Sequence, residues 1–250
     1  MKKSSLLALS LVSLVALVGC GKKDAGGAKK VSAEDFDAKG EAIQEEWDEK
    51  SAEDPEFDPF HYYAKIDYKY SAKVTGTYID PNVPSGKYSS KASFHVIYSG
   101  GWVIDSDEAE EYDEEDLEVI DEIISDAFSY DNYPFYGVAT YFEEYYAAQI
   151  EAGAMKFEWY LPFKAVLSQF FAGEFTEPDP DDPEADPIPA TYSGSFVETI
   201  KWNDSGETTY YQSVEKYEEK YEGHPELDCS YVETYEYKIT YQAVPEKYLA

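Results

Sequence analysis

The chain contains no arginine, because all 20 of its basic residues are lysines. Arginine carries the planar two-pronged group that recognises phosphates and base edges most effectively. The formal net charge of −32 also repels polyanions such as DNA and RNA. These two features together exclude nucleic-acid binding from the functions that we expect.

Cysteine and histidine are scarce. The cysteines are Cys20 and Cys229, and the histidines His61, His95 and His224 are isolated from one another. The sequence contains no zinc-ligand spacing, no Walker A motif, no G-x-S-x-G and no G-x-G-x-x-G. Because 52 acidic residues produce carboxylate pairs by chance, such pairs indicate no site. We therefore expect no catalytic residue, no cofactor and no metal site, and hence a protein that is not an enzyme.

Two acidic stretches, residues 105–126 and 179–186, contain carboxylates that could act as calcium ligands. Neither stretch has the glycine and the terminal glutamate at the spacing of an EF-hand loop. The second stretch also contains prolines, which favour an extended, solvated chain. For both stretches the sequence favours a solvated surface over a calcium site.

The N-terminus has the features of an export signal. Met1-Lys2-Lys3 precedes an apolar run over residues 6–18, which is too short to span a bilayer as a mature helix. Leu17-Val18-Gly19-Cys20 follows and resembles the lipobox of bacterial lipoprotein precursors. The resemblance implies that residues 1–19 are removed and that the Cys20 sulfur carries a diacylglyceryl group. The alternative is an ordinary secretory signal with a chance cysteine.

The lipobox resemblance also implies a location. Two acyl chains give stable attachment, so we expect an exported protein on the outer face of the cytoplasmic membrane, or in the outer membrane of a Gram-negative cell. Residues 20–31 lack apolar periodicity and predict a flexible tether. If Cys20 is lipidated, Cys229 has no partner for an intramolecular disulfide, and its place on an apolar strand face predicts a small buried side chain.

Alternating apolar and polar residues predict long antiparallel strands. In residues 227–243 the odd positions are mostly tyrosine or aliphatic and the even positions are mostly polar, which is typical of a strand with one aromatic and one wet face. Glu233 interrupts the aromatic face and indicates a bulge, a strand end or a polar site. The same alternation predicts strands at residues 62–78, 88–98, 155–161, 192–202 and 208–221, and a short strand at 102–104.

Helical spacing of apolar residues predicts four helices. Ser32, three residues before Asp35, is a plausible N-cap for a helix that ends near Lys50. The other predicted helices cover residues 117–128, 138–149 and 163–171, the last beginning after Pro162. A Pro/Asp-rich loop is expected at residues 177–190. Because the strands after this loop need the earlier helices to cover them, residues 32–250 are predicted to form one domain.

The predicted fold class is α+β, with a single curved antiparallel sheet of about six or seven long strands and helices on its aromatic face. This order of elements resembles the LolA-like open half-barrels of exported lipoproteins and lipoprotein carriers. The resemblance implies a cavity between sheet and helices for an acyl chain or another amphiphile. The 25 tyrosines could line such a pocket, although most are expected simply to fill the sheet face.

Two functions remain open. The first is a membrane-anchored surface lipoprotein that binds an amphiphilic or apolar small molecule between sheet and helices. The second is a structural or interaction lipoprotein of the cell envelope without a small-molecule ligand. A closed, fully packed core would favour the second function over the first.

Overall fold

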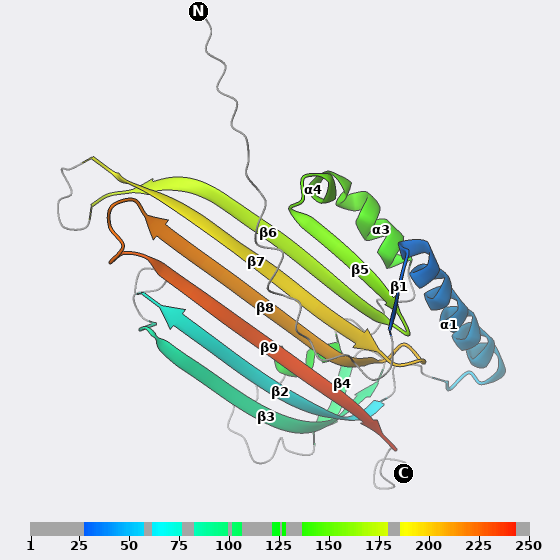
Figure 1. Cartoon of the computed structure of the whole chain (residues 1–250). Helices are drawn as coiled ribbons and strands as arrows, with labels where there is room; N and C mark the ends of the chain where they lie inside the picture. The colour runs from blue at the N-terminus through cyan, green and yellow to red at the C-terminus, as the bar shows by residue number, and fades with distance from the viewer. Residues whose placement is uncertain are drawn as a thin grey trace, which may run out of the picture.

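One antiparallel sheet organises the chain in the computed structural model, which describes residues 28–57, 62–76, 83–99, 102–106, 122–125, 127–128, 137–179 and 186–243. Within these residues the sheet has nine strands in the order β1-β5-β6-β7-β8-β9-β2-β3-β4 (Figure 1). The strands are β1 Lys29–Val31, β2 Tyr62–Thr75, β3 Gly86–Ser99, β4 Trp102–Ser106, β5 Met155–Leu161, β6 Lys164–Glu177, β7 Ile188–Trp202, β8 Thr208–Tyr221 and β9 Cys229–Gln242.

The predicted antiparallel sheet is confirmed, and it has more strands than the six or seven expected. The β5–β9 strands follow one another as a meander, and β9 then pairs with β2 from the N-terminal part of the chain. Tyr237 of β9 lies between Tyr68 of β2 and Tyr211 of β8, with ring centroids 5.5 and 5.6 Å away. The β9 strand therefore joins the two halves of the sheet.

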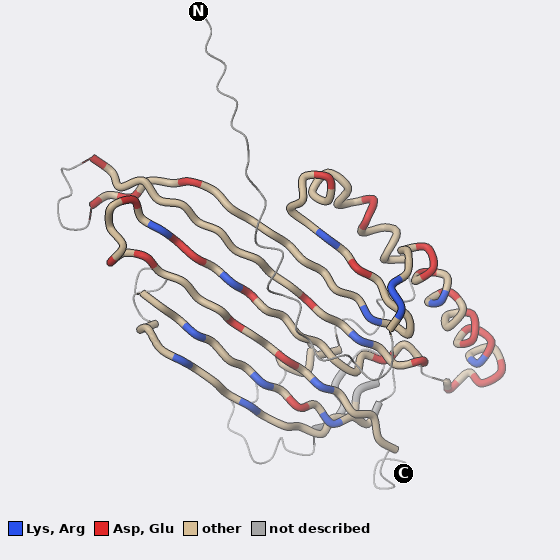
Figure 2. Tube along the Cα trace, viewed as in Figure 1, with Lys and Arg blue, Asp and Glu red and all other residues tan. Residues whose placement is uncertain are grey.

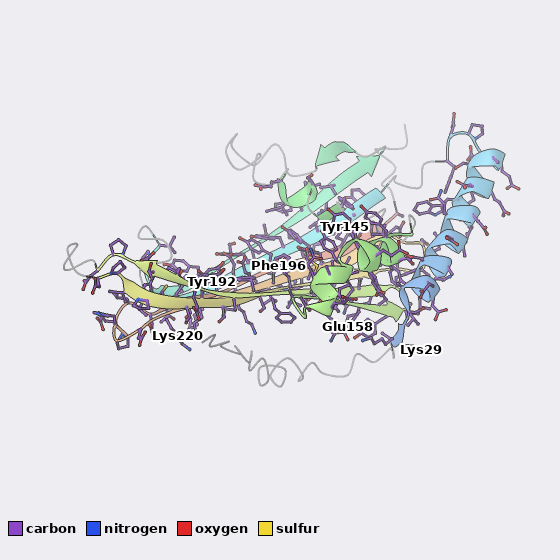
Figure 3. All side chains as sticks on the ribbon, turned by 90° about the horizontal axis from the view of Figure 1, so that it is seen from above. Lys29, Tyr145, Glu158, Tyr192, Phe196 and Lys220 are labelled. Atoms are coloured by element: carbon purple, nitrogen blue, oxygen red, sulfur yellow. The ribbon has the colours of Figure 1, made fainter. Side chains whose placement is uncertain are left out.

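Strand alternation gives the sheet two chemically different faces. One side of the sheet carries the odd-numbered residues of β5, β6, β8 and β9 and the even-numbered residues of β2, β3 and β7, and we call this side the aromatic face. The opposite side is the lysine face. Figure 3 shows Tyr192 and Phe196 on one side of the sheet and Glu158 and Lys220 on the other. In the same view the β2–β4 side of the sheet bends toward the side where the helices lie.

The helices are α1 Ala33–Glu53, α3 Val138–Tyr145 and α4 Ala147–Glu151, with further helical residues at 122–125 and 127–128. The predicted cap of α1 is confirmed, because the Ser32 hydroxyl accepts a hydrogen bond from the Asp35 backbone N–H at 3.1 Å. None of the described helices is long and apolar enough to cross a bilayer.

Two apolar clusters attach these helices to the aromatic face. In the first, the Phe36 ring of α1 lies 5.0 Å from Trp159, 5.4 Å from Phe163 and 6.0 Å from Trp202. In the second, buried residues of the 122–128 segment pack against β2, β3 and β9, with Ile124 fully buried. Tyr211 contacts both clusters, so they meet across β8.

Three predictions about local structure are wrong. Residues 163–171 are not a helix, because they belong to β6 and its preceding turn, where β5 and β7 supply backbone partners on both sides. Residues 29–31, assigned to the flexible tether, form β1 and pair with β5. The Pro/Asp-rich loop is shorter than expected, since β6 extends to Glu177 and β7 begins at Ile188; residues 180–185 lie outside the described residues.

Two glycines on neighbouring strands let aromatic rings cross the sheet surface. Gly173 of β6 lies opposite Tyr192, and Gly194 of β7 lies opposite Phe171. A Cβ atom at Gly194 would collide with the Phe171 ring and would lie 2.6 Å from the backbone oxygen of Lys216. These glycines therefore provide the space in which the two rings lie flat over the backbone.

Gly194→Val is expected to lower the free energy of unfolding by about 1–3 kcal/mol, because the Lys216 carbonyl cannot move without disturbing the β7–β8 pairing. Denaturant unfolding measures the change. Ser193→Val, on the exposed lysine face of the same strand, is the control and should stay within about 0.5 kcal/mol of the original protein. Equal losses in both variants would contradict the collision.

Candidate functional site

A groove of about 220 Å³ lies between the α3–α4 helices and strands β5–β7. Its apolar lining residues are Phe142, Tyr146, Met155, Phe157, Leu167 and Phe196. The rings form a continuous stack. The centroid of the Phe157 ring lies 6.0 Å from that of Phe142, at an interplanar angle of 14°, and 6.0 Å from that of Trp159, at 3°. The groove presents flat aromatic surface and suits a flat or acyl group.

Polar groups stand at the edge of this groove. Gln169 and Glu198 contribute to its lining. The Glu198 carboxylate accepts a hydrogen bond from the Tyr211 hydroxyl at 2.8 Å. The Trp159 indole N–H donates to Glu143 of α3 at 2.8 Å, which ties the helix to β5 beside the groove. The site thus combines an apolar interior with a few polar groups, which is the usual composition of small-molecule sites.

The position of α3 depends on one buried carboxylate from α1. Asp37 is 6% exposed and accepts hydrogen bonds from the backbone N–H groups of Ala139 at 3.0 Å and Thr140 at 2.8 Å. It also accepts a hydrogen bond from the Thr140 hydroxyl at 2.5 Å. Since Gly137 precedes α3 without a side-chain cap, Asp37 satisfies the free N–H groups at the start of α3.

Exposed aromatic side chains continue from the groove along α3. Tyr141 is 57% exposed and Tyr145 is 65% exposed, and their rings stack at 5.7 Å with an interplanar angle of 25°. Tyr145 also makes an edge contact with Tyr146, which lines the groove, at 4.8 Å. An exposed aromatic pair next to an apolar groove is typical of a surface that binds a partner or ligand.

Tyrosines and glutamates alternate on the remaining part of the aromatic face. Tyr217 stacks on Tyr231 at 5.6 Å and on Tyr192 at 6.3 Å. Glu215 and Glu233 lie directly opposite each other on β8 and β9. Tyr231 donates a hydrogen bond to Glu215, and Tyr70 donates one to Glu233 at 2.5 Å. Glu233 therefore belongs to a polar site within a continuous strand, which was one of its three predicted explanations.

Burial and hydrogen bonds to carboxylates raise the pKa values of these phenols. Burial, followed by the hydrogen bond to a neighbouring glutamate, raises the pKa of Tyr70, Tyr217, Tyr221 and Tyr231 above its usual value. Burial and the charge of Glu233 raise the pKa of Tyr235 to about 12. Neutral hydroxyl donors, in place of cations, therefore satisfy the glutamates of this face.

Cys229 is buried and chemically quiet. Burial, followed by its hydrogen bond to Glu219 at 3.2 Å, raises the pKa of the Cys229 thiol to about 12. Only a minute fraction of the thiol is ionised at neutral pH, and the thiolate is the nucleophilic form. Cys229 lies on the apolar face of β9 and behaves as the small buried side chain that the sequence predicts.

The structure places few of the other predicted site residues. Cys20 and most of the acidic stretch 105–126 lie outside the described residues, as do residues 180–185 of the second stretch. In the part of the chain that is described, no group of three or more His, Cys, Asp or Glu side chains could hold a metal ion. Calcium binding by either stretch remains untested by the structure.

The groove residues were not identified individually from the sequence. Phe142 and Phe157 were recognised only as apolar positions of a predicted helix and a predicted strand. Leu167 was assigned to a helix, which would have removed it from the sheet surface. The missed signal is the odd-numbered alternation Ala165, Leu167, Phe171 and Phe175, which continues the period of a strand past the short apolar run.

Comparison with known proteins does not place the chain in a family. No family model matches it, and neither a curated protein nor a solved structure is significantly similar to it. The resemblance to LolA-like half-barrels therefore stays a prediction, and the candidate site depends on its own geometry.

Asp37→Ala is expected to lower the free energy of unfolding by about 1–3 kcal/mol, because it leaves the first N–H groups of α3 without a partner. Denaturant unfolding gives the loss, and amide hydrogen exchange should show α3 opening more often. Asp48→Ala removes an exposed carboxylate of the same helix and should change stability by less than about 0.5 kcal/mol. Unchanged exchange in α3 would rule out the capping role of Asp37.

Proposed function

We propose that the chain is a bacterial surface lipoprotein, anchored through Cys20, that binds the apolar part of a small amphiphilic molecule in the groove between α3–α4 and β5–β7. The groove is the observation that supports this proposal, since it opens between the helices and the aromatic face where the sequence predicts a cavity. The function is binding and not catalysis, and the membrane is the expected partner through the lipid anchor.

The size of the groove limits what it can hold. Its volume of about 220 Å³ is below the range of roughly 300–1,000 Å³ that is typical for drug-sized ligands. A single ring system or a short acyl segment fits this space, with the polar end of the molecule outside near Gln169 and Glu198. An anionic head group at that end would face repulsion from Glu198, so a neutral or cationic head group is preferred.

Gln169→Trp is expected to weaken binding of N-phenylnaphthylamine, a neutral fluorescent amphiphile, roughly tenfold, equivalent to about 1.4 kcal/mol, because the indole would occupy the groove. The measurement is the fluorescence increase on titration of the dye. Gln212→Trp is the matched control, since Gln212 lies on the lysine face of β8, and this variant should bind the dye like the original protein.

The outcomes separate the two functions that the sequence left open. If Gln169→Trp binds the dye unchanged, the groove is not the binding site. If no variant binds the dye and native mass spectrometry of the protein from its own membrane shows no retained small molecule, the interaction lipoprotein becomes the better description. A retained amphiphile that Gln169→Trp no longer carries would identify the ligand.

Cys20→Ser is expected to abolish lipidation, so the protein should lose the mass of the diacylglyceryl group and its salt-resistant attachment to membranes. Mass spectrometry and fractionation with a high-salt wash test this outcome. Cys229→Ser keeps the anchor and should behave like the original protein. An unchanged mass and salt-resistant membrane retention in Cys20→Ser would refute the lipobox assignment.

A further inference from the structure

In strands β2, β3 and β5–β9 of the sheet, all the lysines lie on one face. Strands β2, β3 and β5–β9 contain eleven lysines, and alternation places every one of them on the lysine face and none on the aromatic face. They are Lys65, Lys69, Lys73, Lys87, Lys91, Lys156, Lys164, Lys201, Lys216, Lys220 and Lys238. Figure 2 shows them spread along the strands of both halves of the sheet.

The lysine face carries fewer acidic residues than lysines. Five lie on these strands, namely Asp67, Glu158, Glu174, Glu218 and Glu236. The aromatic face of the same strands has five glutamates and no lysine. The lysine face is therefore cationic in a protein whose formal net charge is −32.

Lysines also lie directly opposite lysines on this face. Lys69 pairs with Lys91 and Lys73 with Lys87 between β2 and β3, and Lys164 pairs with Lys201 between β6 and β7. Like charges in such cross-strand positions destabilise a sheet. Salt bridges relieve a part of the repulsion, for example Lys69 with Glu236 at 2.6 Å. An external anion that lies between the Lys73 and Lys87 side chains would relieve the repulsion between their charges.

Apolar side chains are exposed among these lysines. One transverse row of the lysine face consists of Phe170, Ser195, Lys216, Val232, Lys73 and Lys87, from β6 to β3. In this row Phe170 is 47% exposed and Val232 is 39% exposed. A hollow of about 530 Å³ adjoins the row across β2, β3 and β9, and its charged lining residues are Lys69, Lys91 and Glu236. Apolar side chains exposed on a cationic face are typical of surfaces that lie at a membrane interface.

We propose that the lysine face docks onto the anionic phospholipid head groups of a bilayer, so that the sheet lies along the membrane. The phosphates would lie between opposed lysines, and Phe170 and Val232 would reach the boundary between head groups and acyl chains. The acidic residues elsewhere do not prevent this contact, because salt screens charges beyond about 8 Å at physiological ionic strength.

The position of β1 agrees with this docking if Cys20 carries the proposed lipid, so this argument relies on the proposed function. Lys30 of β1 lies at the edge of the sheet and binds Glu158 of the lysine face at 2.6 Å. Eight residues separate Cys20 from Lys29, and these nine residue-to-residue steps reach at most about 30 Å. The anchor therefore keeps the sheet within reach of the head groups. Docking itself needs no acyl chain and can be tested without it.

The test uses the full chain with Cys20→Ser, so that no acyl chain contributes, and vesicles of phosphatidylcholine with and without phosphatidylglycerol. The unmodified face should bind the vesicles that contain phosphatidylglycerol more tightly, and added salt should weaken this binding. Lys73→Gln with Lys87→Gln should weaken it roughly 25-fold, since each lysine near an anionic surface contributes roughly fivefold. Cosedimentation measures the bound fraction.

The control variant removes the same number of positive charges from a surface outside the lysine face. Lys39→Gln with Lys50→Gln removes two exposed lysines of α1, away from the lysine face, and should leave vesicle binding unchanged. Equal weakening in both double variants would overturn the proposal, because net charge alone would then explain it. Equal binding to the two kinds of vesicle would also overturn it, because docking onto the lysine face requires anionic head groups.

Phe170→Ser tests whether the exposed ring contacts the bilayer. It should weaken binding to the phosphatidylglycerol vesicles without changing the fold, as checked by circular dichroism, because the exposed ring contacts lipid in the docked state. If it has no effect while the lysine variants lose binding, the ring does not enter the bilayer, and that part of the proposal is overturned. Dye binding in the α3–α4 groove should be unaffected in every variant, so failure of docking leaves the proposed groove function separately testable.

Discussion

The alternation of side chains along the strands is the constraint on which the rest of the structure depends. In β9 it places Tyr231, Tyr235 and Tyr237 on one side of the sheet and Glu236 and Lys238 on the other. Each neighbouring strand keeps the same phase through its pairing, so a shift by one residue would exchange the two faces. Such a shift would bury lysines under α1 and expose the tyrosines, which is why the register is strongly determined.

The two faces meet different needs. The aromatic face needs cover, and it receives α1, α3 and the 122–128 segment. Where α3 and α4 meet β5–β7 the packing is incomplete and leaves the groove. Elsewhere on the aromatic face, phenol hydroxyls donate to half-buried glutamates. The lysine face receives no described helix. Its composition fits a solvent-exposed charged surface better than it fits a second packed layer.

The sequence was sufficient for the features that depend on local pattern. Alternation located most of the strands, and Ser32 correctly marked the start of α1. The assignment failed at residues 163–171, because an apolar run of that length fits one face of a helix as well as a buried strand. Strand order was not predictable, since the pairing of β9 with β2 joins segments that are far apart in the chain.

The candidate site was less predictable than the fold, for the same reason. A cavity between sheet and helices was expected, but its residues depend on how α3 is held. That position depends on Asp37, which contacts Thr140 from a distant part of the sequence. A single acidic residue in a helix with many acidic residues carries no signal of this role. The alternation that keeps the strand lysines on one face, in contrast, was present in the sequence and became meaningful only after the register was known.

The pairing of β9 with β2 also has a consequence for how the protein reaches its final form. Tyr68 of β2 pairs with Tyr237 of β9, which is the last strand of the chain. The hairpin of β2 and β3 therefore keeps an unpaired edge at β2 until β9 has been synthesised. Contacts between such distant segments slow folding, and exposed strand edges invite aggregation in the meantime. The N-terminal hairpin therefore gains its partner strand only when the C-terminal end of the chain is present.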